Sequence, residues 1–366
     1  MLACLLACLL ANVLFDICKY PFIIFFHFVN YFTNIRKVHH ITYLKKKKNS
    51  ISLEFCHTSK LKSLSLLQRY IAMKKQILFI IATLLCAGCT PVKKNWMAVC
   101  GDNIVKIIDL SESDSTNIKE VWRWDKDDPQ VNLPQGYDML MRNLDECKFV
   151  DNNTKMLLTA SGDGMMLLDI ETKDILTYAH VPMAHSADLL PGNRIAVALS
   201  THPKGNALEV YDIDSPEKLV YRDSLYSGHG VVWNENRQSL FVLGYKELRE
   251  YKLENWDTET PSLVQVKNWE IPMTSGHDLS PVDDNRMLVS AHEGVMWFDI
   301  DKEEFTPFEP LKDTENVKSV NYDAQTGKLV YTKSEISWWT HNIYQCNPEK
   351  TLTIDSLNIY KVRVMK

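Results

Sequence analysis

The feature that most constrains the fold is a pattern that recurs about every 45 residues after the first quarter of the chain. Each copy contains a short apolar strand, a polar turn and a second apolar strand. The copies span residues 145–160, 184–199, 228–243, 276–291 and 317–332. A third strand of one type follows, typified by the sequence Trp-Phe-Asp-Ile, at residues 107–110, 167–170, 210–213, 250–253, 297–300 and 343–346.

Four short strands in about 45 residues are typical of a propeller blade. One blade cannot bury both of its faces, so blades must stack in a ring. The third strands predict an all-β fold with six four-stranded blades across residues 96–366, although five or seven remain alternatives. The strand at residues 96–100 has no partner before it, and the strand at residues 358–364 has no blade of its own. We therefore predict that the C-terminal strand joins the first blade and closes the ring.

The first 72 residues contain no glycine, which turns usually require, and are rich in Phe, Ile, Asn, Lys and Tyr. The next methionine after Met1 is Met73. We predict that translation starts at Met73 and that residues 1–72 are a mis-assigned, unfolded upstream extension. The alternatives are a cytoplasmic extension and a membrane anchor across residues 2–29, which the charges of Asp16 and Lys19 weaken.

Residues 73–88 have the form of an export signal, with a basic start and an apolar run too short to span a bilayer. They end in Leu-Cys-Ala-Gly before Cys89, which resembles the lipobox of bacterial lipoproteins. One departure is Cys86, which stands where that family usually has leucine. The resemblance implies that Cys89 is acylated, that residues 89–95 form a tether, and that the lipid alone attaches the protein to the membrane. It also implies export to the cell envelope, on the periplasmic or the surface side. An ordinary cleaved signal peptide is the alternative.

Residues 89–366 contain 29 basic and 44 acidic residues, a net charge of −15. Such a surface repels phosphate backbones, so we expect no nucleic-acid partner. The remaining cysteines, Cys100, Cys147 and Cys346, lack the short spacing of a metal site, and we expect them to be small buried apolar residues.

Two copies of the repeat contain a Gly-His pair, at residues 228–229 and 276–277, and aromatic-Asp pairs follow at residues 298–299 and 211–212. These residues resemble the repeat of the WD40/YVTN-like propeller superfamily. The run at residues 184–194 resembles uncharacterised propeller lipoproteins of Bacteroidetes-type bacteria. These resemblances imply a propeller over residues 96–366 and specify little chemistry, because propellers host many unrelated functions. We expect a monomer.

His185, His229 and His277 occupy one register, at the start of the innermost strand in three consecutive copies. We expect them near one mouth of the central channel, with Cys147 and Lys318 in the same register of neighbouring copies. Three imidazoles could bind a divalent metal, the one cofactor that we consider, with Asp188 and Asp278 orienting the rings. A similar use of channel histidines is seen in the oligogalacturonate lyase family. The alternative is that these histidines are structural, as in WD40 repeats.

Aromatic residues between the first two blades are candidates for ligand binding. Trp122, Trp124 and Tyr137 belong to or flank a long insert at residues 125–143 that could stack against a sugar, and Lys318 is a further candidate. We favour the alternative that this loop packs its own aromatic residues. The Trp-Trp pair at residues 338–339 is more typical of blade packing.

The sequence contains no nucleophile elbow, Walker loop or dinucleotide fingerprint. The prediction is therefore an envelope binding module whose partner is a glycan, a small molecule or an envelope protein. The alternatives are a metal-dependent carbohydrate lyase or hydrolase with a histidine site in the channel, and a structural scaffold.

Overall fold

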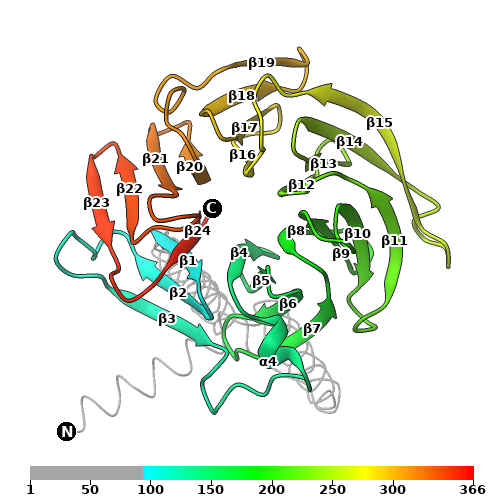
Figure 1. Cartoon of the computed structure of the whole chain (residues 1–366), viewed down its shortest axis with the longest axis horizontal. Coiled ribbons are helices and arrows are strands. Elements are labelled where there is room, and N and C mark those ends of the chain that lie inside the picture. The colour runs from blue at the N-terminus through cyan, green and yellow to red at the C-terminus, as the bar shows by residue number, and fades with distance from the viewer. Residues whose placement is uncertain (1–93) are drawn as a thin grey trace, which may run out of the picture. The chain divides into compact units, whose positions relative to one another are not determined.

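The computed structural model describes residues 94–366, which form six four-stranded antiparallel sheets arranged as blades around a central channel (Figure 1). The predicted six-bladed propeller is confirmed. The predictions about residues 1–72, the signal at 73–88 and the lipidated Cys89 lie outside the described residues. None of the helices in the described part is long and apolar enough to cross a membrane.

Each blade runs from an innermost strand at the channel to an outermost strand at the rim. Blade 2 contains β4 (Leu144–Val150), β5 (Lys155–Ala160), β6 (Gly164–Asp169) and β7 (Ile175–His180). Blade 3 contains β8 (Ala184–Leu190), β9 (Arg194–Leu199), β10 (Ala207–Asp212) and β11 (Leu219–Ser224). Blade 4 contains β12 (Gly230–Asn234), β13 (Ser239–Leu243), β14 (Glu247–Glu254) and β15 (Ser262–Glu270).

The last two blades repeat this order. Blade 5 contains β16 (Asp278–Pro281), β17 (Arg286–Ser290), β18 (Val295–Asp299) and β19 (Glu304–Pro307). Blade 6 contains β20 (Val317–Asp323), β21 (Lys328–Lys333), β22 (Asn342–Cys346) and β23 (Lys350–Thr353).

Blade 1 joins the two ends of the described chain. It combines β1 (Trp96–Gly101), β2 (Ile104–Asp109) and β3 (Glu120–Asp125) with the last strand, β24 (Ile359–Val364), in the order β24-β1-β2-β3. Val362 pairs with Val99 across the closing ladder. The predicted closure by the C-terminal strand is thus confirmed. β24 pairs with β1 and so covers the inner edge of the first blade.

Hydrophobic clusters fill the space between neighbouring blades. Phe241 of blade 4 and Phe298 of blade 5 belong to one cluster, and Ile108 of blade 1 and Val330 of blade 6 belong to another. Because a second strand such as β9 is covered on both faces, its residues 195–199 are all apolar instead of alternating with polar ones. The outermost strand β15 is mostly exposed. This stacking leaves the ends of the innermost strands at the two mouths of the channel.

Candidate functional site

The six innermost strands place one side chain each at the same mouth of the channel. We call this set the mouth ring. In β4, β8 and β20 the ring residue is the bulged one, at which the strand pairing shifts register. In β12 and β16 it directly precedes the strand, and its N–H bonds to the second strand of the blade. The ring consists, in order, of Asp145, His185, His229, His277, Lys318 and Tyr360.

The three predicted histidines do converge. The ring centroids of His185 and His229 are 4.5 Å apart, and those of His229 and His277 are 5.8 Å apart. Nδ1 of His185 lies 3.1 Å from the carbonyl of Met183, and Nδ1 of His229 lies 2.9 Å from the carbonyl of Ser227. A carbonyl only accepts, so both Nδ1 atoms carry the proton and both Nε2 atoms are acceptors. These rings are held by the backbone, not by the turn aspartate of a WD40 repeat.

Burial keeps these imidazoles neutral. It lowers the pKa of His229 to about 3, together with the charge of Lys361 and against the Ser227 hydrogen bond. The pKa of His185 falls well below its ordinary value through burial, His229 and Lys361. Burial and Lys318 do the same to His277. The mouth therefore presents imidazole acceptors at neutral pH.

Two other ring residues have pKa values close to neutrality. Burial, with the nearby charge of Lys361, lowers the pKa of Lys318 to about 8. Burial raises the pKa of Asp145 to about 7, against the lowering influence of Ser161 and Lys361. Sequence reasoning placed Cys147 in this register, but the ring residue is Asp145. Cys147 pairs with Leu158 and is buried in the cluster between blades 1 and 2.

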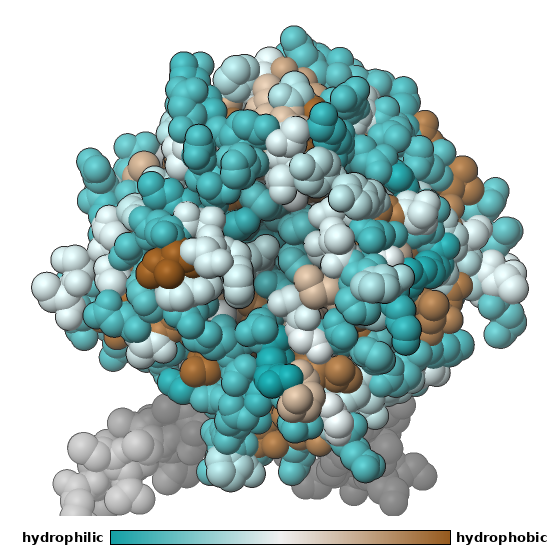
Figure 2. Space-filling view, viewed as in Figure 1, coloured by the Kyte–Doolittle hydropathy of each residue, from teal (hydrophilic) through white to brown (hydrophobic). Residues whose placement is uncertain are grey.

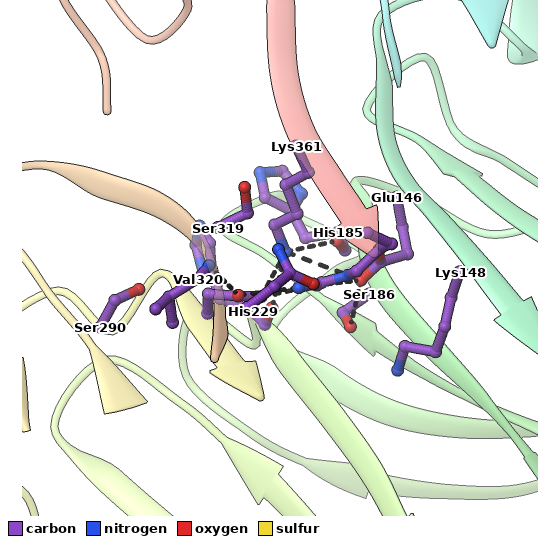
Figure 3. A network of polar contacts seen from close by, with 12 residues as sticks. Glu146, Lys148, His185, Ser186, His229, Ser290, Ser319, Val320 and Lys361 are labelled. Atoms are coloured by element: carbon purple, nitrogen blue, oxygen red, sulfur yellow. Dashed lines mark hydrogen bonds and ion pairs between the residues drawn. The ribbon is translucent and has the colours of Figure 1, made fainter. Parts of the chain in front are cut away.

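A buried ion-pair layer lies beneath the mouth ring and closes the channel. Arg363 binds Glu146 through Nε and Nη2, both at 2.7 Å, and Asp278 through Nη1 and Nη2, at 2.8 and 2.6 Å. Nζ of Lys361 lies 3.8 Å from Glu146 and 3.5 Å from Asp278. Figure 3 shows Lys361 reaching between the inner strands toward His185 and His229, whose carbonyls lie 3.4 and 3.5 Å from its Nζ.

Charges in this layer are balanced within the protein. Burial opposes ionisation of Glu146 and Asp278, but Arg363 and Lys361 hold the pKa of both carboxyl groups below its ordinary value. The two carboxylates and two cations neutralise one another, so this layer is a structural plug instead of a binding surface.

The predicted orienting carboxylates lie elsewhere. Asp278 belongs to the plug and accepts a hydrogen bond from the backbone N–H of Val320 at 3.0 Å. Asp188 is near the opposite mouth, where it accepts from the N–H of Trp233 at 3.0 Å and lies 3.5 Å from Lys148. Neither hydrogen-bonds to a predicted imidazole, because side chains one and three residues along from the ring point to deeper levels of the channel.

The metal prediction finds no support in this geometry. Among residues 94–366, no three His, Cys, Asp or Glu side chains are grouped so that they could hold a metal ion. Nζ of Lys318 lies 3.0 Å from Nε2 of His277 and 3.3 Å from its Nδ1, so an amine already occupies the space beside that ring.

A pocket of about 100 Å³ adjoins the mouth ring and was not anticipated as a site. Asp145 and Tyr360 line it from the ring, and Trp338 and Trp339 line it from the loop between β21 and β22. Asn143 and Asn358 line the same wall, and the backbone N–H and side-chain amide of Asn358 donate to Asp102 at 3.0 and 2.9 Å. Its lining is completed by Gly101, Asp102 and Leu144.

Two observations show that this pocket contains groups whose contacts within the described residues are incomplete. Trp338 is 61% exposed, unlike a blade-packing tryptophan. Asp145 is only 4% exposed, and its Oδ2 atom is buried without a hydrogen-bond partner in the described part of the chain. The nearest ring nitrogen, Nδ1 of His185, is 3.8 Å away. A buried acceptor without a partner is costly, and a ligand hydroxyl would satisfy it.

The other predicted aromatic residues pack internally. Trp124 is buried in the cluster between blades 1 and 2. The indole N–H of Trp122 donates to the carbonyl of Ile170 at 2.7 Å. Tyr137 begins the short helix α4 (Tyr137–Leu140), is buried and donates to Glu217. The insert therefore packs its own aromatic side chains, and only Lys318 of the predicted ligand-binding residues reaches the mouth.

The visible surface of the propeller is mainly hydrophilic, with apolar residues scattered singly (Figure 2). Singly scattered apolar residues form no broad apolar patch on this face.

Two matches among known proteins are themselves of unknown function. A model described as a family of unknown function, DUF6528, matches residues 97–366. A crystal structure of a protein of unknown function from Bacteroides caccae is similar with a TM-score of 0.49 and 12% identity, covering 75% of this chain and 100% of that chain. No curated protein matches the sequence.

Proposed function

The chain belongs to the DUF6528 family, whose function is unknown, and from its own site we propose that it is a saccharide-binding propeller. The ligand is bound on the face that carries the mouth ring, in the pocket between Asp145 and Trp338. The observation that carries this proposal is the buried, unpartnered Oδ2 of Asp145 beside an exposed tryptophan.

The chemistry of the pocket supports a sugar ligand. A pyranose ring has an apolar face, which an exposed indole can cover, and hydroxyl groups, which carboxylate and amide groups can bind. Trp338 can cover the apolar face, and the unpartnered Oδ2 of Asp145 can accept from a hydroxyl, with Asn143 and Asn358 lining the same pocket. The imidazole acceptors of the mouth ring extend this hydrogen-bonding surface toward the channel axis.

A binding screen with two pocket variants tests the proposal. The purified full chain is titrated with neutral and acidic oligosaccharides by calorimetry. Trp338→Ala and Asp145→Asn should each weaken binding about tenfold or more, because each removes a contact worth about 1–2 kcal/mol. Tyr226→Ala is the matched control, since Tyr226 is 57% exposed but lies in the loop between blades 3 and 4, outside the lining of this pocket. Equal binding by all variants would contradict the proposed pocket, and no saccharide binding at all would favour the scaffold alternative.

The setting that we propose is the bacterial cell envelope, with the lipid on Cys89 as the membrane attachment. The lipobox resemblance supports it. In that setting the propeller would capture glycans at the envelope without any membrane-binding face of its own.

A further inference from the structure

Lys318 is the only cation among the six mouth-ring residues, which belong to the described part of the chain. It is the bulged residue of β20, is 8% exposed and lies between His277 and Tyr360 in the ring. Its Nζ contact in the described residues is the His277 imidazole, at 3.0 Å from Nε2. That imidazole is neutral, so the contact gives a hydrogen bond without compensating the charge.

The nearby carboxylates do not form an ion pair with Lys318. Glu146 and Asp278 are paired with Arg363 and Lys361 in the plug. Asp145, the ring residue beyond Tyr360, influences Lys318 only through longer-range attraction. Within residues 94–366 no carboxylate oxygen lies within 4.0 Å of Nζ of Lys318.

A buried ammonium without a counter-ion is costly to a fold. The position of Lys318 suggests a ligand that would supply the counter-ion. Its ring neighbour Tyr360 lines the pocket that we propose for the sugar, so Lys318 lies beside a residue of that pocket. An anionic group there would remove the uncompensated charge and form a charge-assisted hydrogen bond.

We propose that Lys318 is the subsite for an oxyanion on the ligand, a carboxylate or a phosphate, so that the bound saccharide is an acidic one. This inference rests on the proposed function for the sugar, but the oxyanion subsite itself can be tested without any sugar. Lys318 then acts as a binding residue that selects charge, while Asp145 and Trp338 hold the sugar ring.

The first experiment uses inorganic phosphate and acetate as probes. Binding is followed through the C–H proton resonances of the ring histidines, at constant ionic strength. We expect a saturable shift of the His277 resonance that Lys318→Met weakens at least about tenfold, whereas Lys318→Arg, which keeps the charge, stays within about threefold. Lys246→Met, in blade 4, is the matched control and should bind as the parent does. Absence of a saturable shift, or an equal shift in Lys318→Met, overturns the inference.

The folding of Lys318→Met is not expected to confound this test. Methionine fills a similar volume without a charge, so the variant should be at least as stable as the parent in urea denaturation. If Lys318→Met unfolds, Lys318→Gln replaces it. The parent must then show the saturable shift, and Lys318→Gln must lose it.

A second experiment separates the two proposals and the two oxyanion sources. Glucose, glucuronate and glucose 6-phosphate are compared in the parent, Lys318→Met and Asp145→Asn. Preference for glucuronate identifies a carboxylate, and preference for glucose 6-phosphate identifies a phosphate. Loss of that preference in Lys318→Met, with glucose binding kept, supports the oxyanion subsite. Equal binding of all three sugars by the parent overturns the oxyanion subsite and leaves the saccharide proposal intact. Binding of inorganic phosphate without binding of any sugar overturns the saccharide proposal and leaves the oxyanion subsite intact.

Discussion

Arg363 and Glu146 are joined by two parallel charge-assisted hydrogen bonds, from Nε to Oε1 and from Nη2 to Oε2, both 2.7 Å long. This pair connects the closing strand β24 to β4 of the next blade. The same guanidinium binds Asp278 of blade 5 on its other edge. One side chain of the last strand therefore links three blades across the channel.

Removing Arg363 should destabilise the propeller strongly. Arg363→Met leaves Glu146 and Asp278 buried with too few cations, and breaking such a pair costs about 3–5 kcal/mol. Arg286→Met is the control, because the Arg286–Asp283 pair is 43% and 40% exposed and should contribute less than about 1 kcal/mol. Urea denaturation measures both, and equal effects of the two substitutions would show that the plug is not a stabilising junction.

Ring closure should depend on Gly101. A Cβ atom at this position would lie 1.9 Å from the carbonyl oxygen of Asn358, at the entry to β24. Gly101→Ala must therefore push the closing strand away from β1, and we expect a loss of about 1–3 kcal/mol or more. Gly192→Ala is the control.

Gly192 has a positive φ of 71°, but a Cβ there meets its first neighbour, the Trp256 side chain, only at 3.4 Å. This control should lose about 1 kcal/mol, from backbone strain alone. Thermal unfolding compares the variants, and a Gly101→Ala protein as stable as Gly192→Ala would contradict the close approach.

Acid should weaken the fold through the mouth histidines. Burial lowers the pKa of His229 to about 3 and also lowers those of His185 and His277, whereas unfolded histidine titrates near 6.5. Between these values the unfolded chain binds protons that the folded chain does not. The free energy of unfolding should therefore fall as the pH falls below about 6.5, by up to about 1.4 kcal/mol per pH unit for each histidine.

Asp145 opposes part of this effect. Its pKa is raised to about 7, so the folded chain takes up this proton before the unfolded chain does, and acidification between about pH 7 and 4 favours folding at this position. Three histidines outweigh one aspartate. Urea midpoints at about pH 7.5 and about pH 5 should therefore differ less when His185, His229 and His277 are all replaced by glutamine. An unchanged difference would mean that other groups control the acid response.

The lipid prediction separates two neighbouring cysteines. In a bacterial host, Cys89→Ser should abolish labelling by a radioactive fatty acid and move the protein from the membrane fraction to the soluble one, because the thiol is the attachment point. Cys86→Ser should keep both the label and the membrane fraction. Label retained by Cys89→Ser would exclude this lipidation.

Repeat spacing made the blade number predictable, because each blade contains one recognisable third strand. The histidine register was predictable for the same reason. The closing strand was predictable because the first and last strands of the repeat region were left without partners. The ring position of Asp145 was not, since the β4–β5 turn has four residues between Val150 and Lys155, and the β8–β9 turn has three between Leu190 and Arg194. An alignment of β5 with β9 therefore puts β4 out of register with β8, so that Asp145 does not fall opposite His185.

The pocket at Trp338 could not be foreseen for a different reason. It joins the loop between β21 and β22, the turn after β1 and the entry to β4, which are far apart in the sequence. Only the closed ring brings them together. The plug was hidden similarly, because Lys361 and Arg363 meet Glu146 and Asp278 from a strand outside the regular repeat.

The closing strand β24 also sets an order of events during synthesis. A ribosome releases the chain from its N-terminal end, so β1 leaves the exit tunnel long before the strand that pairs with its inner edge. Until then β1 has an open edge, and Glu146 and Asp278 lack the ion pairs with Arg363 and Lys361. The nascent propeller therefore gains the Arg363 junction and Tyr360, one wall of its pocket, only after all the other strands of the ring have been made.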